Sequence, residues 1–194
     1  MCQRKIGKGV SMSMMNDELY ERYKANLEGV NGRCVRTAKA DLAKTIVDLF
    51  KDGGLKTTCI QNTPLLQEAG VAAALEAAGV TVYTDHIRLR AETAQGGIGE
   101  NQYAIAELGT LLQMNDDVDG RIVGTMSEDY FGIVKGSAIV PTYDDMFSIL
   151  AALPQMPSFV GFVTGPSRTA DIECVSTVGV HGPLRLTAVV IDNE

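Results

Sequence analysis

The residues best suited to chemistry lie near the C-terminus, where GPSRTADIE (165–173) is followed by GVHGP (179–183). The apolar run Phe159–Val163 comes directly before them, and a short apolar run bounded by glycine and proline predicts a strand. Thr169 can act as a helix N-cap, and the acids that follow it suit the first turn of a helix. We therefore expect a central strand, a glycine-proline turn, an arginine and a helix start, in that order.

This arrangement predicts an anion site. Backbone N–H groups at the helix start and the guanidinium of Arg168 would converge on one carboxylate or phosphate. In an open α/β sheet, such ligands lie outside the carboxyl ends of the strands. The residues expected to contact the ligand are Gly165, Ser167, Arg168, Thr169, Asp171 and Glu173. The alternative is that Arg168 pairs with one of the two acids and only braces the loop, since charged networks are often structural.

Two further residues could move a proton, His181 and Glu107. His181 lies in a turn beside Gly182-Pro183, and an imidazole titrates near neutral pH. Glu107 lies at the edge of an apolar segment, where a carboxylate can have a raised pKa and act as an acid, a base or a nucleophile. A structural alternative stays open for each residue. The histidine could be a hydrogen-bonding group of the turn, and the carboxylate could accept backbone N–H bonds.

The elements that must position these residues alternate along the chain. Helices are expected at 14–28, 39–52, 63–78 and 142–153, and strands at 33–37, 55–60, 80–84, 130–140 and 184–191, the last of which would close the sheet. Gly70 can break the third helix in two. Strands that alternate with helices of this length predict an α/β fold with a mostly parallel sheet and helices on both faces.

Residues 86–102 interrupt this alternation. The segment His86–Arg90 is locally basic, and QGGIG (95–99) contains three glycines. A phosphate-binding loop would need a following Lys-Ser/Thr or the GxGxxG spacing, and the segment has neither. We therefore expect Gly96 and Gly97 to lie in a flexible loop or at the rim of a pocket.

Length and charge limit the class of protein. A chain of 194 residues and 20.8 kDa fits one domain with its own core. We expect residues 1–13 to be a disordered N-terminal extension and residues 14–194 to form that single domain. The net charge of −7 argues against nucleic-acid binding. No stretch is typical of a signal peptide or a membrane span, so a cytoplasmic protein is expected.

The four cysteines, Cys2, Cys34, Cys59 and Cys174, form no CxxC pair and have no histidine at metal-ligand spacing. No metal or iron–sulfur site is therefore expected in this chain. Buried or half-buried thiols are the expected state in a reducing compartment. Cys174 adjoins the acids of the GPSRTADIE segment, and these would raise rather than lower the pKa of its thiol.

The GPSRTADIE and GVHGP segments resemble the signature of the LUD domain family, of the lactate-utilisation protein C (LutC/YkgG) type. A second segment, AIAELGT (104–110), is similar to the AIAETGT of that family, and the two segments occur in the family's order. The resemblance covers residues 30–194 and adds Gly109 and Thr110 to the expected ligand-binding residues. The chain departs from the family pattern at Leu108, where threonine is usual, and after Arg121, where a leucine-proline-rich segment is usual.

The resemblance implies a fold like that of the NagB/RpiA/CoA-transferase superfamily. It also implies a component of a bacterial system that oxidises L-lactate to pyruvate, with a small carboxylate or phosphate anion held at the GPSRT loop. The implied partners are iron–sulfur lactate-utilisation proteins of the LutA/LutB type. They would carry the clusters, while this chain would bind no cofactor. Two alternatives stay open: a non-catalytic module that assembles the partners or senses a metabolite, and an independent isomerase or CoA-transferase with Glu107 as its nucleophile.

Overall fold

The computed structural model describes residues 12–169 and 177–192. Its centre is a six-stranded sheet in which every neighbouring pair of strands is parallel. The strands, in the spatial order β1-β12-β7-β4-β2-β3, are β1 (Arg33–Thr37), β12 (Arg185–Ile191), β7 (Asp129–Lys135), β4 (Gly96–Glu100), β2 (Thr57–Ile60) and β3 (Thr81–Tyr83). The predicted α/β fold with a mostly parallel sheet is confirmed.

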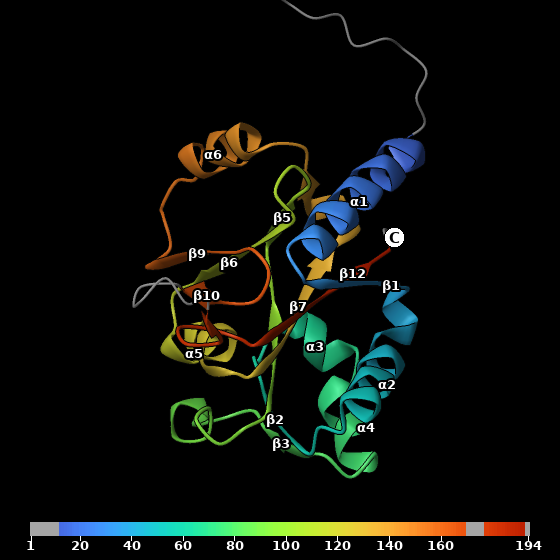
Figure 1. The fold of residues 1–194 in the computed structure, drawn as a ribbon, viewed down its shortest axis with the longest axis vertical. Helices are drawn as coiled ribbons and strands as arrows, with labels where there is room; N and C mark the ends of the chain where they lie inside the picture. The colour runs from blue at the N-terminus through green and yellow to red at the C-terminus, as the bar shows by residue number, and fades with distance from the viewer. Residues whose placement is uncertain (1–11, 170–176, 193–194) are drawn as a thin grey trace, which may run out of the picture.

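Helices cover both faces of this sheet (Figure 1). The elements on one face are α1 (Met12–Gly29), α5 (Val118–Met126) and the 3-10 turn η2 (Ile87–Leu89). The elements on the other face are α2 (Leu42–Gly53), α3 (Pro64–Glu68) and α4 (Val71–Ala77), with the 3-10 turn η1 (Lys39–Asp41) before α2. Each face of the sheet therefore has its own apolar core.

β12 shows how one strand serves both cores. Leu186 and Val190 pack in the cluster with α1 and α5, whereas Val189 and Ile191 pack in the cluster with α2 and α4. A strand buried on both faces has consecutive apolar residues rather than strict alternation. β12 lies between β1 and β7, so this last strand completes the sheet from inside by joining them.

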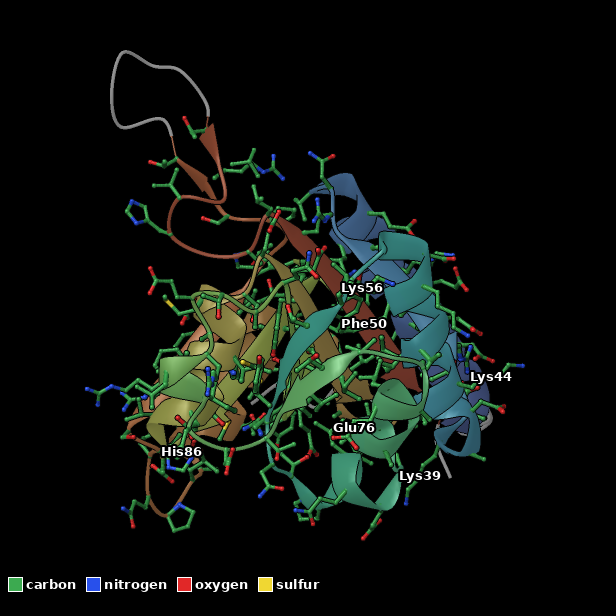
Figure 2. The ribbon with its side chains drawn as sticks, turned by 90° about the horizontal axis from the view of Figure 1, so that it is seen from below. Lys39, Lys44, Phe50, Lys56, Glu76 and His86 are labelled. Atoms are coloured by element: carbon green, nitrogen blue, oxygen red, sulfur yellow. The ribbon has the colours of Figure 1, made fainter. Side chains whose placement is uncertain are left out.

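Local signals set the ends of the helices on the α2 face. Phe50 of α2 lies against the sheet (Figure 2), with its ring centroid 4.9 Å from that of Phe131. Gly54, with φ of +66°, ends α2 in the left-handed conformation that glycine adopts at low cost. Gly70 also has φ of +66° and divides the helix expected at 63–78 into α3 and α4.

A second sheet of four strands stands beside the first. Its spatial order is β8-β5-β6-β9, with bounds β8 (Ile139–Val140), β5 (Tyr103–Ile105), β6 (Thr110–Asn115) and β9 (Phe159–Val163). The helix α6 (Tyr143–Ala151) covers one face, and the 3-10 turn η3 (Gly136–Ala138) precedes β8. Thr142 and Asp145 form a reciprocal capping box at the start of α6.

The position of β9 differs from the prediction. The sequence placed Phe159–Val163 as a central strand, but β9 is the edge strand of the small sheet and is antiparallel to β6. Its residues are half-buried or exposed rather than fully buried. An apolar run fits an edge strand when different neighbours cover its two faces. Here Val160 packs in the α6 cluster and Val163 in the cluster of α1 and α5.

The expectation of a flexible loop at Gly96 and Gly97 is wrong, because these residues belong to β4 in the middle of the parallel sheet. Both positions must be glycine because neighbouring atoms leave no room for a side chain. A Cβ on Gly96 would lie 2.9 Å from the ring of Phe50, and a Cβ on Gly97 would lie 2.7 Å from the carbonyl oxygen of Val123. The sequence shows the glycines but not the helix and ring that press against them.

We predict that Gly97→Ala lowers the free energy of unfolding by about 1–3 kcal/mol, because the new methyl group overpacks the contact between β4 and α5. Gly29→Ala is the control, since a Cβ there meets nothing within 4 Å. The control should change stability by no more than about 1 kcal/mol. Urea unfolding of the two variants checks this. Equal midpoints for both would contradict the packing explanation.

Two of the cysteines, Cys34 and Cys59, are buried free thiols. Burial raises the pKa of each thiol from 9.0 to about 11. A raised pKa means that the folded chain holds the proton after the unfolded chain has released it. The folded state is therefore fully favoured below pH 9 and loses stability as the pH rises from 9 towards 11.

We predict that the urea midpoint falls between about pH 8 and about pH 10.5, and that the fall is smaller in Cys34→Ala/Cys59→Ala. Burial also raises the pKa of Tyr23 and Tyr130, so part of the fall should remain in the double variant. A fall of the same size in both proteins would show that the thiols do not contribute.

Candidate functional site

The two halves of the C-terminal motif lie side by side. β10 (Arg168–Thr169) pairs antiparallel with β11 (Thr177–Val178). The backbone N–H of Ser167 donates to the carbonyl of Pro183 at 2.9 Å, and the N–H of His181 donates to Ser167 Oγ at 3.4 Å. Backbone pairing therefore holds GPSRT and GVHGP together.

This pairing sets the local structure of the described part of the motif. Arg168 and Thr169 are strand residues, and the backbone of Thr169 is paired with Thr177. The helix expected after its N-cap at Thr169 falls in residues 170–176, outside the described residues, so it stays a prediction. Asp171, Glu173 and Cys174 lie outside the described residues, so the pairing of Arg168 with either acid stays a prediction.

The turn that follows α1 contacts this loop through Val30, whose carbonyl oxygen faces both Gly165 and Arg168. Gly165, with φ of +69°, packs so closely that a Cβ would lie 2.7 Å from this oxygen. The exposed side chain of Arg168 donates from Nη2 to the same oxygen. The carbonyl therefore fixes the direction of the guanidinium, while most of its five N–H donors stay unused by this bond.

The AIAELGT segment contacts α1 at Asn26 and Leu27, about one helical turn before Val30. Asn26 Nδ2 donates to the carbonyls of Ala106 and Glu107 at 2.8 and 3.0 Å. Gly109, with φ of +64°, lies against the backbone of Asn26 and Leu27, where a Cβ would be 2.6 Å from the carbonyl carbon of Asn26. Thr110 Oγ1 lies 2.6 Å from Thr164 Oγ1, which joins this segment directly to the residue before the GPSRT loop.

A cavity of about 410 Å³ opens beside the loop, and we call it the signature cavity. Its polar rim contains Thr164, Ser167, Arg168 and His181. Its walls come from β9, from α5 and from the prolines of the two motifs, at Phe159, Gly161, Phe162, Val163, Gly124, Thr125, Pro166 and Pro183. The cavity thus combines one guanidinium, one imidazole, three hydroxyl groups and one amide with the apolar side chains of β9, which suits a small polar ligand.

Glu107 contacts the start of α6 rather than the signature cavity. Its Oε2 accepts a hydrogen bond of 2.9 Å from the backbone N–H of Tyr143, in the first turn of α6. A carboxylate at this place also interacts favourably with the positive end of the helix dipole. Glu107 is exposed and does not line the signature cavity. The structure therefore places Gly165, Ser167, Arg168 and His181 together and leaves Glu107 and Gly109 outside the lining.

Sequence reasoning missed Gln113, the buried polar residue of the signature cavity. Gln113 is 1% exposed, and its Nε2 donates to the carbonyl of Gly120 at 2.7 Å. Gly124 of α5 leaves room for it, since a Cβ there would lie 2.6 Å from Gln113 Oε1. The available signal was a glutamine inside the apolar strand TLLQMN, which indicates a hydrogen-bonded polar group in a core.

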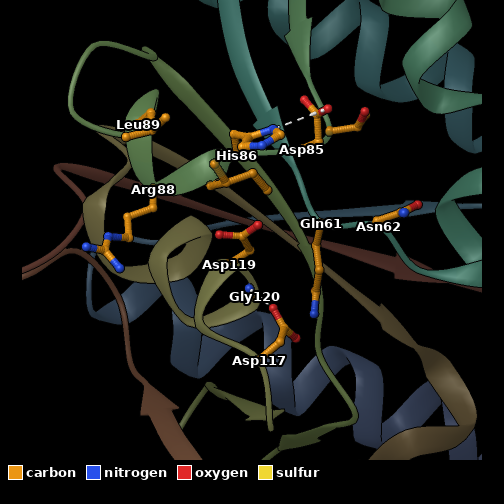
Figure 3. Close-up of a pocket in the computed structure, with 11 residues that line it drawn as sticks. Gln61, Asn62, Asp85, His86, Arg88, Leu89, Asp117, Asp119 and Gly120 are labelled. Atoms are coloured by element: carbon orange, nitrogen blue, oxygen red, sulfur yellow. Dashed lines mark hydrogen bonds and ion pairs between the residues drawn. The ribbon is translucent and has the colours of Figure 1, made fainter.

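A second, larger cavity of about 670 Å³ lies where β2 and β3 end and α5 begins (Figure 3). Gln61 is buried within it, with Nε2 2.7 Å from Asn115 Oδ1. Asp85 Oδ2 and His86 Nδ1, both exposed, lie 3.4 Å apart in its lining. His86 and Arg88, from the basic part of 86–102, line this cavity, whereas Gly96 and Gly97, for which a pocket rim was expected, do not.

No helix among residues 12–169 and 177–192 is long and apolar enough to cross a bilayer. In the same ranges, no three His, Cys, Asp or Glu side chains gather as metal ligands would.

Comparison with known proteins decides the family. The sequence model of the LUD domain matches residues 20–191. The chain belongs to the LUD domain family. It is 31% identical to lactate utilization protein C 1 of Bacillus mycoides, covering 93% of this chain and 82% of the relative, and 29% identical to YkgG of Escherichia coli, covering 83% and 74%. A solved DUF162 family protein of Deinococcus radiodurans has a similar fold, with a TM-score of 0.64 and 18% identity over 94% of this chain and 99% of that one.

We predict that Thr110→Val lowers the free energy of unfolding of this LUD domain by about 1 kcal/mol, because it removes a hydroxyl that is 1% exposed and bonded to Thr164. The control is Thr93→Val, where the exposed hydroxyl bonds only to the nearby carbonyl of Arg90. The control should change stability by less than about 0.5 kcal/mol. Thermal unfolding of both variants tests the difference. Equal losses of stability would show that the hydrogen bond between Thr110 and Thr164 contributes no more than an exposed one.

Proposed function

We propose that this LUD protein binds a small carboxylate, such as L-lactate or pyruvate, in the signature cavity and serves in bacterial utilisation of L-lactate. The observation that carries the proposal is the gathering of Ser167, Arg168 and His181 around one cavity. Two relatives across most of the chain are named lactate utilization protein C, from Bacillus mycoides and from a Geobacillus strain.

The geometry supports a carboxylate as the ligand. The bond from Arg168 to Val30 orients a guanidinium whose remaining donors can form paired hydrogen bonds to the two oxygens of a carboxylate. The 2-hydroxyl or 2-keto oxygen of lactate or pyruvate can be met by the hydroxyl groups of Ser167 and Thr164 or by the imidazole of His181. The apolar side chains of β9 suit the methyl group of the ligand.

Oxidation of L-lactate to pyruvate releases two electrons and two protons. In this proposal, His181 is positioned to accept one proton, the second proton passes to water, and iron–sulfur partner proteins would accept the two electrons. The chain contributes binding and orientation of the substrate.

We predict that Arg168→Ala weakens the binding of L-lactate and pyruvate about 10- to 100-fold, which is the effect of losing a charge-assisted hydrogen-bonding partner. Arg88→Ala is the matched control, because this arginine lines the larger cavity and is also exposed. Isothermal titration with sodium L-lactate and sodium pyruvate measures both variants. Loss of binding in Arg88→Ala but not in Arg168→Ala would show that the ligand binds in the larger cavity and would refute the proposal.

A second candidate function is a non-catalytic module that assembles or regulates iron–sulfur partners. The position of Glu107 favours it, since this carboxylate caps α6 and does not line the cavity with Arg168. Affinity purification of the tagged protein from its native host separates the two functions. Under this second function, cluster-bearing proteins co-purify equally well with wild type and with Arg168→Ala, and lactate oxidation is unchanged by the substitution. Under the first, lactate oxidation falls while the partners still co-purify.

A further inference from the structure

β9 presents an apolar edge to solvent. It pairs with β6 on one side, and among the described residues no strand pairs with its other side. Its five residues, FVGFV, include no charge and no proline. Natural proteins protect exposed sheet edges with charged side chains, prolines, bulges or a covering element. The edge of β9 has no charged or proline residue within it, which marks it as a pairing surface.

An aromatic cluster extends this edge onto α6. Tyr143, Phe147 and Phe162 contact one another, with ring centroids 4.6–5.9 Å apart, and the rings of Phe147 and Phe162 are stacked. They are 40%, 45% and 37% exposed. Contiguous exposed aromatic side chains are the usual centre of a protein interface. The edge strand and the aromatic cluster thus form one continuous surface, which we call the β9 edge.

The sequence of β9 is complementary to itself. When two copies are aligned antiparallel about Gly161, Phe159 lies opposite Val163 of the second copy, and Val160 lies opposite Phe162. Every pair except the central glycines then joins an aromatic and a β-branched residue, which is a stabilising cross-strand combination. The two Phe162 side chains become diagonal neighbours, a separation that aromatic rings can span.

We propose that the β9 edge binds a second copy of this chain, so that two four-stranded sheets join as one eight-stranded sheet across a two-fold axis. A symmetric pair uses the same surface on both copies, which the pairing about Gly161 satisfies. The second β9 also adds a wall to each signature cavity, because Phe159, Gly161 and Val163 line it. The inference does not depend on the proposed ligand or on lactate utilisation.

Charge gives this pairing a distinctive salt dependence. Each chain carries a net charge of −7, and Asp144 and Asp145 flank the aromatic cluster in the first turn of α6. Two copies therefore repel each other at low ionic strength, and added salt screens that repulsion. Dimers should become more abundant as sodium chloride is added. A basic partner protein on the same surface would show the opposite dependence.

Sedimentation equilibrium of the full chain tests the proposal. Wild type is expected to reach the mass of two 20.8-kDa chains, more readily at higher salt. Phe162→Lys and Phe162→Glu should each be monomeric, and an equimolar mixture of the two should pair, because opposite charges then meet across the axis. Leu89→Lys, a charge added at a remote side chain that is 73% exposed, should leave the dimer intact. A wild-type monomer at all salt concentrations, or no pairing in the mixture, overturns the proposal.

Hydrogen exchange provides a test that needs no variant. Amide exchange across residues 159–163 should slow as the protein concentration rises through the range in which dimers form. Unchanged exchange there, with a dimer present by mass, would mean that the copies meet through another surface and would also overturn the proposal.

Discussion

The end of α1 is the constraint on which the candidate site depends. Within one turn of chain, Asn26 and Leu27 contact the AIAELGT segment, and the carbonyl of Val30 contacts both Gly165 and Arg168. The two motif segments of this LUD domain are thus held by the same short piece of backbone, and the bond from Thr110 to Thr164 joins them to each other. Without that anchor, the guanidinium would have no fixed direction and the signature cavity no fixed rim.

Much of the fold could be predicted because residues close together in the sequence determine it. The apolar stripe of α2, the break at Gly70 and the capping box at Thr142 are each set by residues within a few positions. The positions of β4 and β9 could not be predicted in this way. Gly97 reads as a loop residue until Ser127 and Val123 are placed against it, and β9 reads as a central strand until α6 is placed beside it.

The candidate site was predictable in composition but not in arrangement. The motif itself identified Ser167, Arg168 and His181, which the structure brings to one cavity. Their local structure followed from pairing between β10 and β11, a contact that spacing in the sequence does not reveal. A proton-transfer role for Glu107 was predicted from its apolar flanks, but the structure agrees with the alternative, a carboxylate that accepts a backbone N–H bond, here from Tyr143, thirty-six positions further along the chain. Gln113 was missed because a single glutamine in a strand has no motif around it.

The order of strands also has a consequence for how the chain is made. Among residues 12–169 and 177–192, β1 pairs with β12 alone, so residues 33–37 leave the ribosome long before their partner, residues 187–191. Until then β1 has no neighbour in the sheet, and β7 lacks one of its two. Loop closure over so long a separation is slow. Until β12 emerges, the nascent chain therefore exposes the unpaired apolar edges of β1 and β7, the kind of surface that chaperones protect.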